Sequence, residues 1–312
     1  AILGTLNIAG VRLSIRQGRV EARSNDINAG TVTLVKNSDL PQGGTIENVK
    51  VAKPVFILEP SGRYRATADM SLGGGVLGSI KIGAARASVN LNNDQVALNN
   101  LTADVMDGNL SGDATIAFNN RTRSVINANF NNLDLGKLLA LQGGKVVPIE
   151  GQTSGNVDLS FNGTNFKTAS GNLSADIVAN AGSQATELIQ VNGRVEATAT
   201  NGLFNLDVAR LNTQNTEFNA TGQVDLNGDG SNLNLALDST DASEVSRIIS
   251  VLELSPKFDQ KVNEYKAEFA GNLKFNGSLK GNFSDPTIEG RASLDSLSLR
   301  GRTVGALSTD FR

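Results

Sequence analysis

The stretch GNVDLSFNG, from Gly155 to Gly163, decides the fold class. Every second side chain along it is apolar, and the apolar set is Val157, Leu159 and Phe161. Because successive side chains of a β-strand point to opposite faces of a sheet, this alternation predicts a strand with one apolar and one polar face. A similar segment, GNLKFNG, lies at Gly271 to Gly277 and predicts a second strand of the same kind.

The same period of two runs through most of the chain. It is clear in DATIAF, which begins at Asp113, in VINANFNN, which begins at Val125, and in NLNLALDS, which begins at Asn232. Strict alternation favours antiparallel sheet with one face in water over buried parallel sheet. Gly, Asn and Asp interrupt these segments, and such residues are typical of hairpin turns. In ASLDSLSLRG the alternation shifts by one residue between Leu294 and Leu297, which predicts a β-bulge or bend.

The composition excludes several classes of chemistry. Hydrophobic residues make up 39% of the 312 residues, aromatic residues make up 4%, and there is no Trp, so the apolar faces are mainly aliphatic. The chain has no His and no Cys, which rules out a Ser-His-Asp triad, a Cys-His dyad and an ordinary zinc site within it. No pair of carboxylates stands out for hydrolysis. We therefore expect neither an enzyme nor a bound metal or cofactor.

Two segments, one polar and one rich in glycine, resemble known sites in part. DLNGDGSN, from Asp225, resembles the start of a calcium-binding loop, but the twelfth position would be Ala236 instead of Glu. Strand patterns flank it, so a polar hairpin turn is the better interpretation. MSLGGGVLGS, from Met70, lacks the Lys-Ser/Thr of a phosphate-binding loop and predicts a bend or a break in the sheet.

Charge and hydropathy limit the partners. The net charge is −3, and no cluster of Lys and Arg in the sequence suits the neutralisation of phosphates, so a nucleic-acid partner is not expected. No apolar run approaches the roughly 18 residues that a membrane-spanning helix needs. The chain opens and closes within strand patterns, so we expect a fragment of a longer chain, with room for an anchor or a targeting segment outside it.

Helical patterns are few and short. One helix is predicted near 134–141, and another near 241–252, where DASEVSRIISVL begins with an Asp-x-x-Glu cap. The second helix has an apolar side that we interpret as a cap on the sheet interior instead of a membrane-binding patch. That side consists of Val245, Ile248, Ile249 and Leu252. KFDQKVNEYKAEF, from Lys257, is a weaker helix candidate that runs into a strand, and SQATELIQ, from Ser183, is weaker still.

The order of strands, short helix and further strands recurs along the chain. It predicts a partial repeat at 1–90, a repeat at 91–195 that contains the first helix, and a repeat at 196–312 that contains the second. Repeats that each leave an apolar face unfinished are expected to stack into a continuous structure.

The predicted helices are too few to cover the apolar faces of so many strands. An open apolar patch of that size is rarely tolerated on a soluble monomer. The sheet therefore either folds on itself and fills its own interior, or curls into a trough lined for a ligand. Medium aliphatic side chains suit acyl chains in a trough and also suit a small core. The candidate lining residues are Ile116, Phe118, Ile126, Phe130, Val157, Leu159, Phe161, Leu173, Ile177, Leu206, Val208, Phe218, Val224, Leu226, Leu233, Leu235, Leu237, Phe269, Leu273, Phe275, Ile288 and Leu294.

Three segments carry a resemblance to a known family. They are NFNNLDLGKLLAL followed by PIEGQTSGNVDLSFNG, then LSGDATIAFNN from Leu110, and GNLKFNGSLKGNFSDPTIEGRASLDSLSLRG from Gly271. The last contains Gly-x-Phe-Ser-Asp-Pro-Thr-Ile-x-Gly, which looks like a recurrent phrase of the AsmA-like superfamily. The chain resembles the TamB-type members of that superfamily most closely, over about residues 90–312, and residues 1–90 fit more loosely.

The resemblance implies a fold and a function. The fold would be an elongated, curled antiparallel sheet, a β-taco or repeating β-groove, with a few short amphipathic helices. The protein would lie in the periplasm of a diderm bacterium, anchored in the inner membrane by a segment outside this chain. It would carry phospholipid acyl chains between the inner and outer membranes and serve outer-membrane biogenesis beside a barrel partner of the Omp85 type. No catalytic residues carry over from the family.

Two other functions stay open at this point. One is a chaperone or scaffold that offers its sheet edges or groove during the translocation and assembly of outer-membrane or autotransporter proteins. The other is a self-packed structural or adhesive β-solenoid whose interior holds no lipid.

Overall fold

The computed structural model describes residues 2–35, 43–78, 80–143, 148–179, 188–225, 228, 230–251, 256–282 and 287–311. These residues form antiparallel sheet with three short helices, which confirms the predicted all-β class. Contacts divide the chain into two compact units. Unit 1 comprises Ala1–Gly144 and Ser154–Ala169, and unit 2 comprises Lys145–Thr153 and Ser170–Arg312. The division into three repeats stays a prediction.

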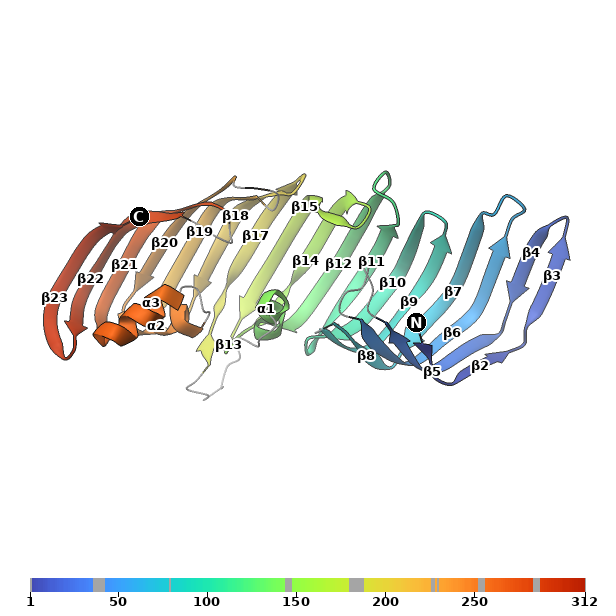
Figure 1. Ribbon diagram of the computed structural model, residues 1–312, viewed down its shortest axis with the longest axis horizontal. Helices are drawn as coiled ribbons and strands as arrows, with labels where there is room; N and C mark the ends of the chain where they lie inside the picture. Colours follow the sequence, from blue (N-terminus) through green and yellow to red (C-terminus); the bar gives the residue numbers. More distant parts are fainter. Residues whose placement is uncertain are drawn as a thin grey trace. The chain divides into compact units, whose positions relative to one another are not determined.

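Unit 1 consists mainly of strands that follow one another along the chain (Figure 1). The strands are β1 (Ile2–Leu3), β2 (Leu6–Ala9), β3 (Arg12–Arg16), β4 (Arg19–Arg23), β5 (Asp26–Leu34), β6 (Gly44–Leu58), β7 (Tyr64–Leu72), β8 (Gly74–Leu77), β9 (Ile80–Asn92), β10 (Gln95–Val105), β11 (Gly108–Ala117) and β12 (Arg123–Asp134). Helix α1 (Leu135–Gly143) follows β12 directly, and β14 (Gln152–Asn162) enters the unit from Ser154. The ladder β6–β7–β9–β10–β11–β12 is antiparallel throughout.

Unit 2 begins its main sheet with the part of β15 (Asn165–Val178) that follows Ala169. The later strands are β17 (Asn192–Thr200), β18 (Leu203–Asn212), β19 (Thr216–Asp225), β20 (Ser231–Ser239), β21 (Ala267–Gly281), β22 (Thr287–Leu299) and β23 (Arg302–Phe311). Each pairs antiparallel with the next. The short strands β13 (Ile149–Glu150) and β16 (Ile189–Gln190) pair in parallel as a separate sheet.

Two helices connect β20 to β21 in unit 2. They are α2 (Ala242–Val251) and α3 (Pro256–Tyr265), and both contact β21. Figure 1 places them at one end of the strands. The helices predicted near 134–141, near 241–252 and from Lys257 are confirmed as α1, α2 and α3. Most of the SQATELIQ segment lies outside the described residues, and its end, Ile189–Gln190, forms β16.

Several hairpins close with two residues that both have positive φ. They are Gln17-Gly18, Met106-Asp107, Asn201-Gly202 and Arg300-Gly301. This backbone conformation is that of a type I′ turn, whose twist matches the twist of the flanking strands. The tight turns therefore keep consecutive strands in direct antiparallel register.

Bulges interrupt several strands. The shift predicted between Leu294 and Leu297 is confirmed, because the register of β22 on β23 changes there. A similar shift lies in β10 between Leu98 and Leu101, where Asn100 has a φ of 53° and its backbone N–H donates to Asp113 Oδ1 at 2.8 Å. An extra residue at each bulge returns the following apolar side chains to the face of the preceding ones.

Two carboxylates stabilise the first turn of helix α2. Asp241 is the N-cap, because its Oδ1 accepts hydrogen bonds from the Ser243 N–H at 3.0 Å and from the Ser243 hydroxyl at 2.7 Å. The predicted Asp-x-x-Glu cap is only half realised. The buried Glu244 carboxylate instead accepts from the hydroxyls of Thr216 at 2.6 Å and Thr213 at 2.8 Å. Glu244 therefore fixes the helix to the turn between β18 and β19.

Gly222 allows a close approach of two strands in unit 2. Its φ is +124°, and a Cβ built there would clash with the carbonyl oxygen of Asn232 in β20. An L-residue rarely adopts this backbone conformation, so strain adds to the clash.

We expect Asp241→Ala to lower the free energy of unfolding by about 1 kcal/mol at neutral pH, the usual value of an N-cap side chain. The Asp241 pKa is lowered, chiefly by the hydrogen bond from the Ser243 hydroxyl. A carboxyl with a lowered folded-state pKa stabilises the fold above its unfolded-state pKa, and this contribution is lost as the pH falls through the folded-state value. The difference between the wild type and the variant should therefore shrink below about pH 4. Urea unfolding at several pH values measures it, and Asp241→Asn, which retains a cap, is the control. Equal losses in the two variants would contradict this assignment.

We expect Gly222→Ala to lower the free energy of unfolding by about 2 kcal/mol or more, because it adds a clash to backbone strain. Gly30→Ala is the control, since a Cβ on Gly30 would have no atom within 4 Å. Thermal unfolding of both variants checks the prediction, and equal melting temperatures would show that Gly222 has no special role.

Candidate functional site

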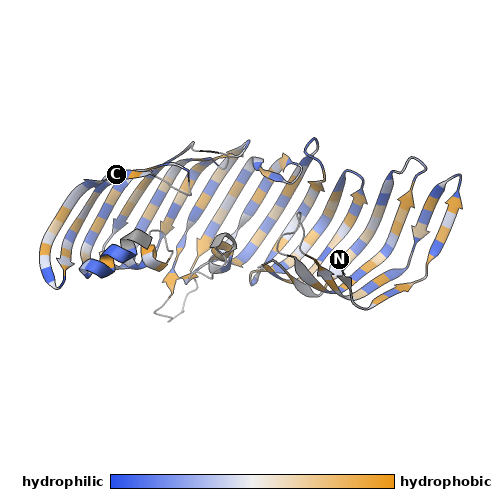
Figure 2. Ribbon diagram, in the orientation of Figure 1, coloured by the Kyte–Doolittle hydropathy of each residue, from blue (hydrophilic) through white to orange (hydrophobic). Residues whose placement is uncertain are grey.

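The register of unit 2 aligns large apolar side chains in rows that cross the strands. Residues directly opposite each other in an antiparallel ladder share a face. One such row is Ile177, Gly193, Leu211, Phe218, Leu237, Phe275 and Ala292. A second row is Leu173, Ala197, Leu206, Gly222, Leu233, Leu279 and Ile288. Figure 2 shows apolar and polar residues alternating along these strands.

A row of smaller side chains separates these two. It consists of Ala175, Val195, Ala209, Ala220, Leu235 and Gly277. The three rows together form what we call the apolar face of unit 2. Neighbouring strands lie about 4.8 Å apart, so opposite side chains of a row lie within reach of one another, except at Gly193, Gly222 and Gly277.

Unit 1 has an apolar face of the same construction. Its rows are Phe56, Ala66, Leu91, Val96 and Ile116, then Ala68, Val89, Leu98, Ala114 and Ile126, and then Leu72, Ala85, Ala103, Leu110 and Phe130. The β10 bulge lies between Leu98 and Leu101 and keeps Val96, Leu98 and Ala103 on one face. Without that extra residue, the second half of β10 would turn its apolar side chains to water.

The opposite face of unit 2 is polar and carries ion pairs. Arg194 bridges Asp176 and Glu196, Lys274 pairs with Asp238 at 2.8 Å, and Arg291 pairs with Asp310 at 2.8 Å. Hydrogen bonds from Arg291 lower the pKa of Asp310. Exposed pairs of this kind add little stability, but they show which face is hydrated.

Most of the predicted lining residues lie on these apolar faces. In unit 1 the rows contain Ile116, Ile126 and Phe130, while Phe118 follows the end of β11 and is 50% exposed. In unit 2 the apolar face also includes the pairs Phe204–Val224, Phe269–Leu297 and Leu273–Leu294. The predicted residues of unit 2 that share this face are Leu173, Ile177, Leu206, Phe218, Val224, Leu233, Leu235, Leu237, Phe269, Leu273, Phe275, Ile288 and Leu294.

The opening stretch lies in β14. Arg123, from the polar face of β12, donates from its guanidinium to the Ser160 hydroxyl at 2.6 Å and to the Ser160 carbonyl at 3.2 Å. Ser160 therefore lies on the hydrated face. Alternation then places the remaining predicted residues on the apolar face. They are Val157, which is half-buried, and Leu159 and Phe161, which are buried.

Two predicted residues do not join the rows. Val208 pairs with Glu196, a residue of the polar face, because the β18 bulge between Leu206 and Ala209 shifts the alternation by one residue. Leu226 lies outside the described residues.

Sequence reasoning missed many members of both faces. Nothing before Ile116 was predicted, yet Phe56, Leu91 and Leu98 belong to the rows of unit 1. The sequence LNNL at 98–101 could have revealed the bulge in β10, because two Asn separate two Leu that belong to the same face. Leu211 and Leu279 of unit 2 were missed for lack of a continuous pattern around them.

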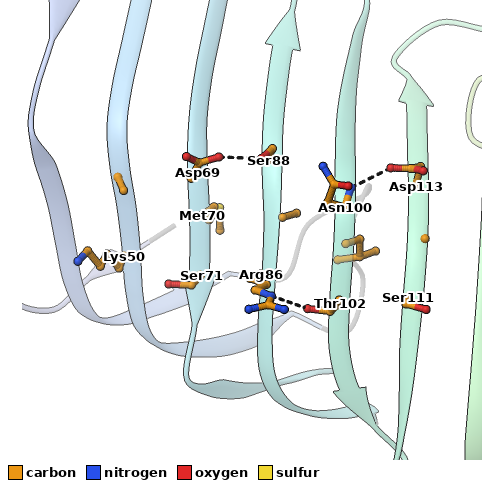
Figure 3. Close-up of a pocket in the computed structure, with 14 residues that line it drawn as sticks. Lys50, Asp69, Met70, Ser71, Arg86, Ser88, Asn100, Thr102, Ser111 and Asp113 are labelled. Carbon is orange, nitrogen blue, oxygen red and sulfur yellow. Dashed lines mark hydrogen bonds between the residues drawn. The ribbon is translucent and has the colours of Figure 1, made fainter.

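A hollow of about 770 Å³ lies in unit 1 across β6, β7, β9, β10 and β11. Figure 3 shows its side chains bonded to one another: Ser88 donates to Asp69 at 2.7 Å, and Arg86 donates to Thr102 at 3.1 Å. Register places these residues on the hydrated face, opposite to Met70 and Ala87. Its cations and carboxylates balance, so it favours no ligand of either charge.

Other site types find no support among the described residues. No three Asp or Glu side chains come together there as a cation site. In the segment that imitates a calcium loop, Asp225 accepts a hydrogen bond from the Gly230 N–H at 3.3 Å, which is turn chemistry, and Asn227 and Asp229 lie outside the described residues. None of the described helices is long and apolar enough to cross a membrane.

Comparison with models of protein families, with curated proteins and with solved structures gives no match.

Proposed function

We propose that the protein is a periplasmic bridge-like lipid transport protein, whose apolar faces hold phospholipid acyl chains on their way between the inner and outer membranes. One observation carries this proposal: the register aligns apolar residues, most of them aliphatic, in rows across the strands of each unit. Many of these side chains are only half-buried, among them Leu206, Leu235 and Phe275. Half-buried aliphatic rows have apolar area left to bury against a ligand.

The dimensions suit an acyl chain. The row from Leu173 to Ile288 crosses seven strands, which gives a length of roughly 29 Å at the usual strand spacing. The hydrocarbon core of a bilayer is about 30 Å thick and contains two layers of lipid tails. A single tail is therefore shorter than the row. Each methylene that moves from water onto such a surface contributes up to about 0.8 kcal/mol.

A curled groove would make this binding stronger, and we include it in the proposal. β-Bulges and glycines within strands are the usual devices that bend a sheet. The bulges in β10 and β18 and the positive φ of Gly222 supply such devices in both units. Curling would place the side chains of one row opposite those of another and surround an acyl chain.

The resemblance to TamB-type proteins supplies the cellular part of the proposal. It favours the periplasm of a diderm bacterium, an inner-membrane anchor in a part of the protein outside this chain, and an outer-membrane barrel partner of the Omp85 type. In this proposal the protein is not an enzyme, binds no metal or cofactor and has no nucleic-acid partner.

One observation favours a second function, that of a scaffold for outer-membrane strands. Within the described part of the chain β3 pairs only with β4, which makes it an edge strand there, and its Leu13 and Ile15 are 64% and 65% exposed. An edge with free backbone groups and exposed apolar side chains can accept an added strand. A self-packed solenoid remains the third alternative.

Photocrosslinking distinguishes these functions. A photoreactive amino acid at Leu235, on the apolar face, should capture phospholipid, because its side chain lies between Ala220 and Gly277 in the row of small residues. The neighbouring Asn234 is the matched control, since it is exposed on the opposite face. Mass spectrometry of the crosslinked products measures the difference.

The outcomes separate the alternatives. Capture of lipid at Leu235 and not at Asn234 supports transport along the apolar face. Equal labelling at the two positions would contradict it. Capture of nascent barrel proteins without lipid would favour the scaffold, and no capture at all would favour the self-packed solenoid.

A further inference from the structure

One corner of unit 2 collects cations around an exposed aromatic ring. Tyr265, at the end of α3, is 42% exposed. The Lys261 Nζ lies 5.4 Å from the centroid of its ring, and the Arg300 Cζ lies 5.9 Å from it. The Arg300 N–H also donates to the Tyr265 carbonyl at 3.0 Å. The turn between β22 and β23 is thereby fixed against the end of the helix.

Two further cations flank this group in the chain. Lys266 follows Tyr265, and Arg302 closes the turn that contains Arg300. Among the described residues, no carboxylate forms an ion pair with Lys266, Arg300 or Arg302, whereas Lys261 pairs with Glu264 at 2.8 Å. The other nearby acids in the chain are Asp259, in α3, and Glu268, on the strand that follows. The end of α3 and the β22–β23 turn together therefore carry an excess of positive charge, although the net charge of the chain is −3.

The same corner borders the apolar face. Leu299 pairs with Arg302 across the turn and with Ala267 on the other side. Because opposite residues share a face, Arg302 stands at the end of the apolar face. The next pair inward is Phe269 and Leu297. A ligand that lies along the apolar face thus meets cations where that face ends.

We propose that Lys261, Tyr265, Arg300 and Arg302 form a site for the phosphate of an anionic lipid headgroup, whose acyl chains lie on Phe269 and Leu297. This inference rests on the proposed function, since it needs acyl chains on the apolar face. Arginine suits phosphate because its planar guanidinium donates two parallel hydrogen bonds to phosphate oxygens. Tyrosine suits a boundary between an apolar surface and water, with its ring on the apolar side and its hydroxyl in water.

Charge complementarity gives the site a preference among lipids. A zwitterionic headgroup brings its own cation to the corner and an anionic headgroup does not, so the anionic lipid gains more from Arg300 and Arg302. Exposed charge pairs are each weak, so a preference of about fivefold is the expected scale. It should decrease as the salt concentration rises, because salt screens exposed charges.

The test uses vesicles that contain phosphatidylglycerol and phosphatidylcholine with identical acyl chains. The protein is incubated with them and re-isolated, and its lipids are extracted and quantified by mass spectrometry. The wild type should be enriched in phosphatidylglycerol relative to the vesicles. The double variant K261Q/R300Q should lose about fivefold of that enrichment while it takes up the same total amount of lipid. The control K274Q/K280Q removes equal charge from the hydrated face and should retain the enrichment.

Each outcome has one meaning. Lipid uptake without enrichment, or equal enrichment in both double variants, overturns the headgroup site and leaves the proposed function standing. No uptake in the wild type overturns the proposed function, and the site with it. Excess inorganic phosphate should lower the enrichment no more than sodium chloride of the same ionic strength does. If phosphate abolishes the enrichment and the chloride does not, the site binds free phosphate and the lipid assignment is overturned.

Discussion

The antiparallel register of the strands is the constraint on which the rest of the structure depends. Residues directly opposite each other share a face, so apolar residues must pair with apolar residues, and polar with polar, between neighbouring strands. In β20, Leu237 lies between Phe218 and Phe275, and Leu233 lies between Gly222 and Leu279. A slip of one residue in any strand would exchange its faces and place leucines among the ion pairs. The register therefore turns a pattern within each strand into continuous surfaces across many strands.

Local irregularities preserve this order over long strands. Where the alternation in the sequence shifts by one residue, a bulge adds one residue and returns the following apolar side chains to the same face. Examples are Asn100 in β10 and the segment between Leu294 and Leu297 in β22. A glycine such as Gly222 brings two strands together where a larger residue would push them apart. At the end of the strands, Asp241 caps α2, and Glu244 fixes this helix to the turn between β18 and β19. One face is left hydrated and ion-paired, and the other is left with aliphatic area to bury.

Much of this arrangement could be predicted from the sequence. Alternation in GNVDLSFNG and NLNLALDS predicted the strands and the side chains that share a face, and the phase shift after Leu294 predicted a bulge. The prediction failed where a bulge was not recognised. The alternation in the sequence assigns Val208 to the apolar face, but Val208 pairs with Glu196 of the polar face. The hydrogen-bond partners of Glu244 could not be predicted from the sequence either. Thr213 and Thr216 are distant from Glu244 in the chain and meet it only once β19 and β20 have paired. The cation cluster around Tyr265 could not be predicted for the same reason, because Arg300 reaches the Tyr265 ring only once the β22–β23 turn has formed.

The central claim is that the apolar faces hold acyl chains instead of closing on themselves. Extraction of lipids from the purified protein, followed by mass spectrometry, tests it most directly. We expect phospholipid in a reproducible ratio to protein that survives gel filtration. A lipid-free protein that takes up no phospholipid from vesicles, and whose apolar side chains pack only against one another, would contradict the claim.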